Sequence, residues 1–240
     1  MIPIKDNVPN IRKPVVVGII FALNLLVFLF ELSLPNKGLL LLLQLYGAVP
    51  ARLTDPAWAE AAGFPSQGFD SAVTYMFLHG GWLHFLLNMW VLWVFADNVE
   101  DALGHWRFAA FYLLSGVAAL AMHLLFNPGS TTPVVGASGA IAGVMGGYFR
   151  LFPHARVVTL IPIVFIPWIV ELPAVAFLGI WFVIQLASGL FASAPVNDGQ
   201  SVAWWAHAGG FLFGLLVVRL LGPLDCRYCY LPEEKAYDRR

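Results

Sequence analysis

Six long apolar stretches constrain the fold of this chain more than any other feature of its sequence. They cover residues 14–34, 80–98, 106–126, 135–152, 173–191 and 203–222. Each is close to the roughly 20 residues that a helix needs to cross the hydrocarbon core of a bilayer. Of the 240 residues, 60% are hydrophobic and 11% are charged, whereas about a quarter of the residues of soluble domains are charged. The pattern predicts an all-α, polytopic membrane protein built as a bundle of six transmembrane helices.

Two further apolar segments do not fit this pattern. Residues 39–45 are too few to cross a bilayer, and we expect them to lie in the membrane interface. Residues 157–170 are also short, and Pro162 and Pro167 interrupt them. Because proline removes a backbone donor and ends or kinks a helix, we expect this segment to be interfacial or re-entrant.

The distribution of positive charge predicts the orientation of the spans. With six spans and a cytoplasmic N-terminus, Lys37 and Arg52 fall outside and the other basic residues fall inside. Those inside are Lys5, Arg12, Lys13, Arg107, Arg150, Arg156, Arg219, Arg227, Lys235, Arg239 and Arg240. This bias follows the positive-inside rule, so both termini are predicted to be cytoplasmic. The first apolar stretch lacks a small-x-small cleavage site, and we interpret it as an uncleaved span rather than a signal peptide.

The same layout divides the chain into three parts. Residues 1–13 are predicted to form a cytoplasmic N-terminal segment, residues 14–222 the membrane-embedded domain, and residues 223–240 a cytoplasmic tail. The tail contains Cys226 and Cys229, which supply at most half of the four ligands of a structural zinc site. We therefore favour a plain tail over a metal or redox role, and we expect neither a metal nor a cofactor.

The net charge and the short tails also limit which partners and which location are expected. A net charge of −1 argues against nucleic acid, which favours a basic surface. The short tails hold no folded extra domain, so the bilayer is expected around the chain and no obligate protein partner is expected. The compact six-span form and the absence of a transit peptide favour a bacterial inner membrane.

Among the polar side chains within the apolar stretches, four stand out: His84, Asn88, Ser138 and His207. Such side chains are costly in hydrocarbon and tend to mark a working site. Tryptophans, which favour the membrane interface, precede both histidines by two or three residues, and Ser138 lies near the start of its own stretch. We expect all four side chains to lie in one shallow layer near the outer face.

Rows of small residues predict that the fourth and sixth spans pack closely. These rows, at four-residue spacing, are Gly139, Gly143 and Gly147, then Ser138, Ala142 and Gly146, and in the sixth span Ala206, Gly210 and Gly214. Small residues let helix backbones approach each other in lipid. If these faces meet, Ser138 and His207 come within hydrogen-bond reach, and the imidazole can take the proton of the serine hydroxyl.

The remaining polar groups predict how such a pair would work. No carboxylate is expected at this depth, which favours a Ser–His dyad over a triad. A dyad needs strong stabilisation of the oxyanion. The backbone N–H of Ser138 lies near a helix N-terminus, where donors are free. His84 and Asn88 lie four residues apart on one helical face and can add side-chain donors.

Three short motifs occur in order along the chain. His84 and Asn88 form H-x-x-x-N, residues 136–139 (Gly136, Ala137, Ser138 and Gly139) form G-x-S-G, and residues 206–210 read AHAGG and end at Gly210. Within a six-span layout, these motifs resemble those of the rhomboid intramembrane serine proteases, over about residues 40–220. Residues 100–107 are similar to the inner loop of that family, and His79 resembles a recurring position that we interpret as structural.

The resemblance implies a rhomboid-like bundle and a serine endopeptidase that cleaves other membrane proteins in or near their transmembrane segments, without a cofactor. It implies Ser138 and His207 as catalytic residues, and an oxyanion hole of His84, Asn88 and the backbone N–H of Ser138. It also implies that the fifth helix and the outer loops admit substrate and water.

Two positions depart from the pattern of the family. Many members carry an aromatic residue one turn after the serine, stacked on the histidine, and this chain has Ala142 there. The sequence does not identify the side chain that replaces it. The first outer loop lacks an obvious Trp-Arg pair found in some members, although Arg52 and Trp58 are present.

Two other functions compete with the protease. A catalytically inactive relative would bind membrane clients, but such relatives usually lack the serine or the histidine. A transporter would carry polar residues in the inner halves of its helices, which are apolar here. Taken singly, Ser138 or His207 is more often a helix-packing residue, but their shared depth and the family pattern favour catalysis. We interpret His105, His123 and His154 as interfacial or packing residues.

Overall fold

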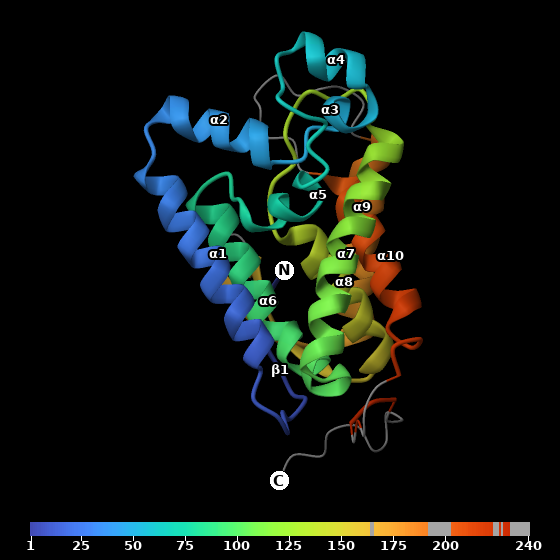
Figure 1. Cartoon of the computed structure of the whole chain (residues 1–240). Coiled ribbons are helices and arrows are strands. Elements are labelled where there is room, and N and C mark those ends of the chain that lie inside the picture. Colours follow the sequence, from blue (N-terminus) through green and yellow to red (C-terminus); the bar gives the residue numbers. More distant parts are fainter. Residues whose placement is uncertain (164–165, 192–202, 223–225, 227, 231–240) are drawn as a thin grey trace.

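Helices form most of the chain that the structure describes, which is residues 1–163, 166–191, 203–222, 226 and 228–230 of a computed structural model (Figure 1). The longer helices are α1 (Val15–Ser33), α2 (Asn36–Tyr46), α6 (Trp82–Leu103), α7 (His105–Phe126), α8 (Ser138–Leu151), α9 (Ala174–Phe191) and α10 (Trp204–Val217). Between α2 and α6 lie the short helices α3 (Pro50–Thr54), α4 (Pro56–Ala61) and α5 (Ser71–Thr74) and the 3-10 turn η1 (Tyr75–Phe77).

Each of the six predicted spans contains one long helix. Within the described residues, α1, α7 and α9 are long and apolar enough to cross a membrane by length and composition, and α10 is a shorter apolar helix. Helix α6 ends in acidic residues, and α8 has 14 residues, which corresponds to about 21 Å. The described part of the chain thus has three candidate spans on these criteria, and the count of six stays a prediction.

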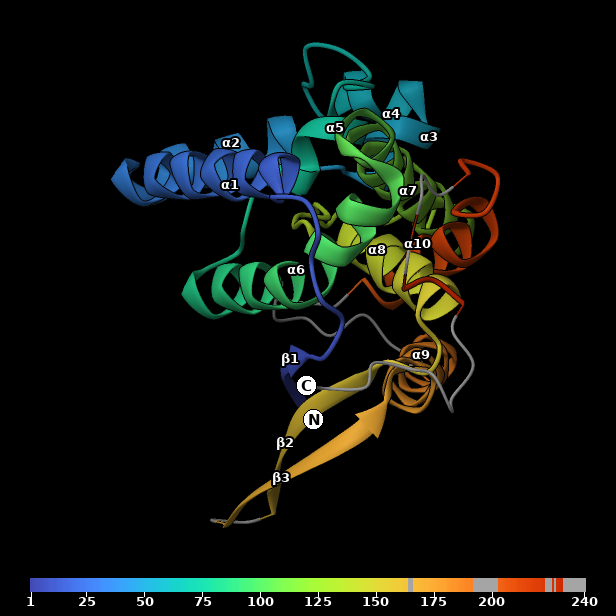
Figure 2. The ribbon, with the colours of Figure 1, turned by 90° about the horizontal axis from the view of Figure 1, so that it is seen from below.

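The prediction of an all-α chain is wrong, because a small antiparallel sheet is present. Its strands are β1 (Ile2–Asp6), β2 (Arg156–Ile163) and β3 (Ile166–Pro173), in the order β1-β2-β3. The segment expected to be interfacial or re-entrant is the β2–β3 hairpin, which projects from the helices beside α9 in Figure 2. Val157 and Thr159 are buried while their neighbours are more exposed, an alternation typical of a half-buried strand. Pro162 and Pro167 face each other near the hairpin tip, where a missing donor costs least.

Helix α2 contains the other ambiguous segment. It has no buried residues, and Figure 1 shows it lying across the end of α1 rather than continuing that helix. At 11 residues it is too short to span a bilayer, as predicted. Its position in the membrane interface stays a prediction.

Glycines set the close packing of α8 against α7 and α10. A Cβ atom on Gly210 would lie 2.0 Å from the carbonyl oxygen of Gly139, and one on Gly214 would lie 1.9 Å from that of Gly143. A Cβ atom on Gly143 would lie 2.3 Å from the side chain of Ser115 in α7. The predicted contact between the small-residue rows of the fourth and sixth spans is therefore confirmed, and α7 covers a second face of α8.

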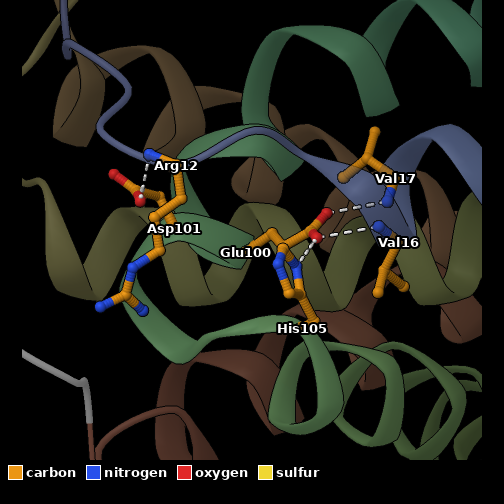
Figure 3. A network of polar contacts seen from close by, with 6 residues as sticks. All are labelled: Arg12, Val16, Val17, Glu100, Asp101 and His105. Carbon is orange, nitrogen blue, oxygen red and sulfur yellow. Dashed lines mark hydrogen bonds and ion pairs between the residues drawn. The ribbon is translucent and has the colours of Figure 1, made fainter.

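Two carboxylates at the end of α6 hold the start of α1 (Figure 3). The Glu100 carboxylate accepts hydrogen bonds from the backbone N–H groups of Val16 and Val17, both at 2.8 Å, and contacts His105 Nδ1 at 2.5 Å. The Asp101 carboxylate accepts from the backbone N–H of Arg12 at 2.9 Å. Since the first N–H groups of a helix lack partners within it, Glu100 supplies the missing acceptors of α1, whereas Asp101 binds the segment just before that helix. His105 is thus a partner of Glu100, not a simple packing residue.

Arg52 anchors the first outer connection. Its guanidinium donates to the carbonyl oxygens of Leu45 at 2.6 Å and Ser66 at 3.0 Å and lies over the ring of Phe64. The side chain is 2% exposed, and a buried guanidinium needs such acceptors. The predicted loop is therefore packed on itself around one arginine.

The N-terminal strand and the described residues near 230 both meet the end of α8, where the sheet begins. Strand β1 pairs with β2, so the predicted N-terminal segment contributes to the folded unit. Cys226 and Cys229 form a disulfide, and Tyr230 donates its backbone N–H to Leu151 O at 2.8 Å. In its described residues, the tail thus contains a disulfide and a hydrogen bond to α8, which the expectation of a featureless tail did not include. The predicted polar loop at 193–201 and most of the tail lie outside the described residues, and the three domain boundaries stay predictions.

Candidate active site

Ser138 begins α8 directly after a tight glycine turn. Gly136 has a φ of +120°, which side-chain-bearing residues rarely adopt. A Cβ atom there would lie 2.6 Å from His84 Nε2, so only glycine fits on both counts. The Gly136 N–H donates to Tyr75 O at 2.9 Å, which fixes the turn to η1. As a result, the Ser138 hydroxyl and its backbone N–H lie at the free N-terminus of a buried helix.

His207 contacts the hydroxyl of Ser138. The distance from His207 Nε2 to Ser138 Oγ is 2.8 Å, although the two residues lie 69 positions apart. His207 is the fourth residue of α10, and the packing of Gly210 on Gly139 brings the two helices close enough for this contact. The predicted proximity of the two side chains is confirmed.

A residue absent from the sequence predictions contacts the other nitrogen of the same ring. Gln185 Oε1 of α9 lies 2.7 Å from His207 Nδ1, and Gln185 is 6% exposed. The same signal that marked Asn88 could have found Gln185. Both are amide side chains inside an apolar helix, where an unpaired amide is costly.

Aromatic rings from two helices surround the imidazole. The Trp181 ring lies 6.0 Å from the His207 ring, tilted by 35°, and the Trp204 ring lies 6.3 Å away, edge-on. Ala142, the position where many relatives carry an aromatic residue, is fully buried. The replacement that the sequence did not identify is therefore supplied by α9 and by the first residue of α10.

His84 and Asn88 point hydrogen-bond donors toward the turn before Ser138. The Gly80 N–H donates to His84 Nδ1 at 3.3 Å, so a neutral ring carries its proton on Nε2, which faces Gly136. Asn88 Nδ2 lies 3.6 Å from the Cβ position of Gly136, is buried, and has no acceptor among the described residues. Buried donors normally have partners, so this amide is suited to an acceptor that arrives with a substrate.

One further histidine, His79, contacts a member of this group. His79 is buried and packs edge-on against Phe85 and His84, and its backbone N–H donates to the Glu31 carboxylate at 3.0 Å. These contacts agree with a structural residue. Within the residues that the structure describes, no three His, Cys, Asp or Glu side chains are grouped to hold a metal ion.

The sequence of the chain matches a known protein family over most of its helical part. Residues 67–224 match the family described as the Rhomboid domain, which is more than half of the chain and includes the turn, the serine and both histidines above. The chain belongs to the rhomboid family. The predicted resemblance is therefore confirmed, and the rhomboid domain includes α6 to α10 and the β2–β3 hairpin.

Individual relatives agree with this family. Presenilin-associated rhomboid-like protein A, mitochondrial, of Danio rerio is 31% identical over 58% of this chain and 34% of its own length. Rhomboid protein 1, mitochondrial, of Saccharomyces cerevisiae is 29% identical over 61% of this chain and 40% of its own. RHOMBOID-like protein 6, mitochondrial, of Arabidopsis thaliana is 38% identical over 31% of this chain. The chain matches less than half of the length of these relatives.

The prediction of a bacterial inner membrane is contradicted by these relatives, because their names place them in mitochondria. That prediction relied on a compact form and on the absence of a transit peptide. Neither feature distinguishes a bacterial from a mitochondrial membrane protein, because a targeting segment is removed from many mature proteins.

Proposed function

We propose that this rhomboid chain is an intramembrane serine endopeptidase that cleaves other membrane proteins in or near their transmembrane segments. The observation that carries the proposal is the 2.8 Å contact between Ser138 Oγ and His207 Nε2. A serine hydroxyl is a weak nucleophile, and a neighbouring imidazole that accepts its proton makes it reactive.

The proposed reaction begins when the Ser138 oxygen attacks the carbonyl carbon of the scissile peptide bond. His207 Nε2 takes the hydroxyl proton, and the carbonyl oxygen becomes an oxyanion. As the C–N bond breaks, the imidazolium returns the proton to the leaving nitrogen, leaving an ester on Ser138. Water, activated by the same imidazole, then hydrolyses the ester and restores the serine.

The oxyanion would be stabilised by three donors. The Ser138 N–H lies at the start of α8, where N–H groups have no partner within the helix. The His84 Nε2–H faces the Gly136 turn, and the Asn88 amide lies beside it without an acceptor among the described residues. Fixed donors in a water-poor site stabilise developing charge more than they stabilise the neutral carbonyl. Their convergence on the attacking serine supports the protease over a helix-packing role for these residues.

The surroundings of the site support a substrate that arrives through the bilayer. Helix α9 exposes large apolar side chains, including Val183 and Leu190, which are 62% and 67% exposed, as expected of a helix that faces lipid. The site is formed by α6, α8, α9 and α10, so a transmembrane segment beside α9 lies near the dyad. We therefore infer membrane proteins as the substrate class.

Cleavage of a reporter in liposomes tests the proposal. Purified chain is reconstituted with a tagged transmembrane reporter, and the fragments are followed over time. Ser138→Ala should abolish cleavage while the variant stays folded and inserted. Ser115→Ala is the matched control, since Ser115 is a buried intramembrane serine in α7 without a hydrogen-bond partner in the described chain; it should cleave at close to the wild-type rate.

The outcomes separate the proposed protease from its rivals. An uncleaved reporter that co-purifies with the wild-type chain would favour an inactive client-binding protein. Cleavage that persists in Ser138→Ala at the wild-type rate would remove Ser138 as the nucleophile.

A further inference from the structure

The base of the proposed dyad is held by an amide from a third helix. His207 uses both ring nitrogens: Nε2 lies 2.8 Å from Ser138 Oγ and Nδ1 lies 2.7 Å from Gln185 Oε1. Ser138, Gln185 and His207 come from α8, α9 and α10. We propose that Gln185 is the positioning residue of His207, which sets the tautomer and ring orientation that the Ser138 hydroxyl needs. This inference rests on the proposed protease function.

The chemistry of the amide oxygen decides which tautomer the contact allows. A glutamine Oε1 atom can only accept a hydrogen bond, so His207 Nδ1 must carry a proton to bond with it. In a neutral imidazole, Nε2 is then unprotonated and can accept the proton of Ser138. The opposite tautomer would present an N–H to the serine oxygen and could not act as its base.

The same contact becomes stronger during the reaction. When His207 takes the serine proton, the ring becomes an imidazolium, and the bond from Nδ1–H to Gln185 Oε1 becomes charge-assisted. The amide thus stabilises a charge that exists after proton transfer but not before it, which lowers the barrier rather than aiding ground-state binding. It does so without placing a second full charge in the apolar interior, where an unpaired carboxylate is costly.

Packing fixes Gln185 at this position. Trp181 lies one turn before it on the same helix and contacts the His207 ring, so two side chains of one α9 face hold the imidazole. The neighbouring Phe182 stacks on Phe211 of α10, with ring centroids 4.6 Å apart and planes 20° apart. Gln185 itself is 6% exposed, so little water competes for His207 Nδ1.

Steady-state cleavage over a range of pH tests the role. Gln185→Met keeps the chain length of the side chain and removes the acceptor; we expect kcat to fall about 10- to 100-fold with KM within about twofold, the loss expected of one charge-assisted bond. Gln185→Glu keeps an acceptor for Nδ1 and adds a negative charge. It should recover much of kcat and move the acid limb of the kcat profile to higher pH, because a carboxylate favours the imidazolium. Among the described residues, His84 and His123 are the other ionisable side chains that act on His207, and they are unchanged in these variants.

The matched control places the same methionine on the exposed side of another helix, α7. Leu114→Met, at a residue that is 50% exposed, should leave kcat and the pH profile at wild-type values. A wild-type kcat in Gln185→Met would overturn the inference. So would a kcat–pH profile of Gln185→Glu whose acid limb coincides with that of the wild type. A wild-type chain that does not cleave at all would instead refute the proposed function.

If a Gln185 variant fails to fold, a measurement on the wild-type chain tests the role of Gln185 instead. Nitrogen NMR of histidine-labelled protein, with the His207 signals assigned by their loss in His207→Ala, reports which ring nitrogen carries the proton. We expect Nδ1 protonated and Nε2 unprotonated in the neutral ring. The reverse assignment would contradict the role of Gln185.

Discussion

At the residue scale, the site combines a paired base with an unpaired donor. Both nitrogens of His207 have partners, whereas Asn88 Nδ2 is buried without an acceptor in the described part of the chain. An unpaired buried amide costs free energy in the resting protein. An oxyanion that formed beside Gly136 would remove this cost during the reaction, so the arrangement favours the transition state over the resting state.

Asn88→Ala should therefore slow turnover much more than it weakens substrate binding. We expect kcat for reporter cleavage to fall about 100-fold, as for the loss of one oxyanion donor, and KM to change by less than about threefold. Leu87→Ala is the control, because Leu87 is the adjacent residue of α6 and is half-exposed. An Asn88→Ala enzyme with wild-type kcat would exclude the amide from the oxyanion hole.

The sequence predicted most residues of the site but not Gln185. Ser138, His207, His84 and Asn88 interrupt apolar stretches near helix starts, and that local signal was enough to bring them together. Gln185 is just as polar, but its partner depends on how α9 is rotated toward α10, which no local pattern reports. Trp204 was predicted only as an interface residue, and Trp181 was not predicted to contact His207, for the same reason.

At the element scale, backbone contact between α8 and α10 sets the distance across the dyad. The carbonyl oxygens of Gly139 and Gly143 occupy the space where side chains on Gly210 and Gly214 would begin. Two helices in such contact cannot accept a methyl group without moving apart. The contact between Ser138 and His207 depends on this spacing, although none of these four glycines takes part in the proposed reaction.

Gly214→Ala should destabilise the protein and lower its activity together. A Cβ atom there would lie 1.9 Å from Gly143 O, and we expect unfolding in detergent to need about 1–3 kcal/mol less free energy, with cleavage reduced at least about tenfold. Gly179→Ala in α9 is the control, because its nearest neighbour would lie at 3.9 Å. If Gly214→Ala melted at the wild-type temperature and had wild-type activity, α8 and α10 would not need the close contact at Gly214.

At the scale of the whole molecule, the N-terminal strand β1 closes the bundle on the side away from the dyad. Strand β1 joins β2, and the Asp6 carboxylate at its end accepts a hydrogen bond from the Tyr148 hydroxyl of α8. The sequence did not predict the pairing of β1 with β2, because these strands are separated by about 150 residues and pairing over that distance leaves no local signal. The long helices were predictable, because each lies in one apolar stretch.

The buried position of Asp6 predicts a pH dependence of stability. Burial, aided by the charge of Asp97 and opposed by the Tyr148 hydrogen bond, raises the pKa of Asp6 to about 7. Between the ordinary pKa near 4 and this value, the unfolded chain releases the proton while the folded protein keeps it. The contribution of Asp6 to the free energy of unfolding is therefore full below about pH 4, falls as the pH rises, and levels off above about pH 7.

Asp6→Asn should remove this part of the pH dependence. Melting temperatures of the wild-type and variant proteins, measured in detergent from pH 4 to pH 8, should converge or cross as the pH rises, with the variant gaining relative stability up to about pH 7. A difference between the two proteins that stays constant across this range would show that Asp6 titrates normally in the folded state.

The central claim is that contact with His207 makes the Ser138 hydroxyl a nucleophile. Reaction of the membrane-embedded chain with a serine-directed fluorophosphonate, followed by mass spectrometry of its peptides, tests this claim without a substrate. We predict one covalent adduct, on Ser138, formed in the wild-type chain and reduced at least about 100-fold in rate in His207→Ala. An unlabelled Ser138, or labelling at the same rate in His207→Ala, would contradict it.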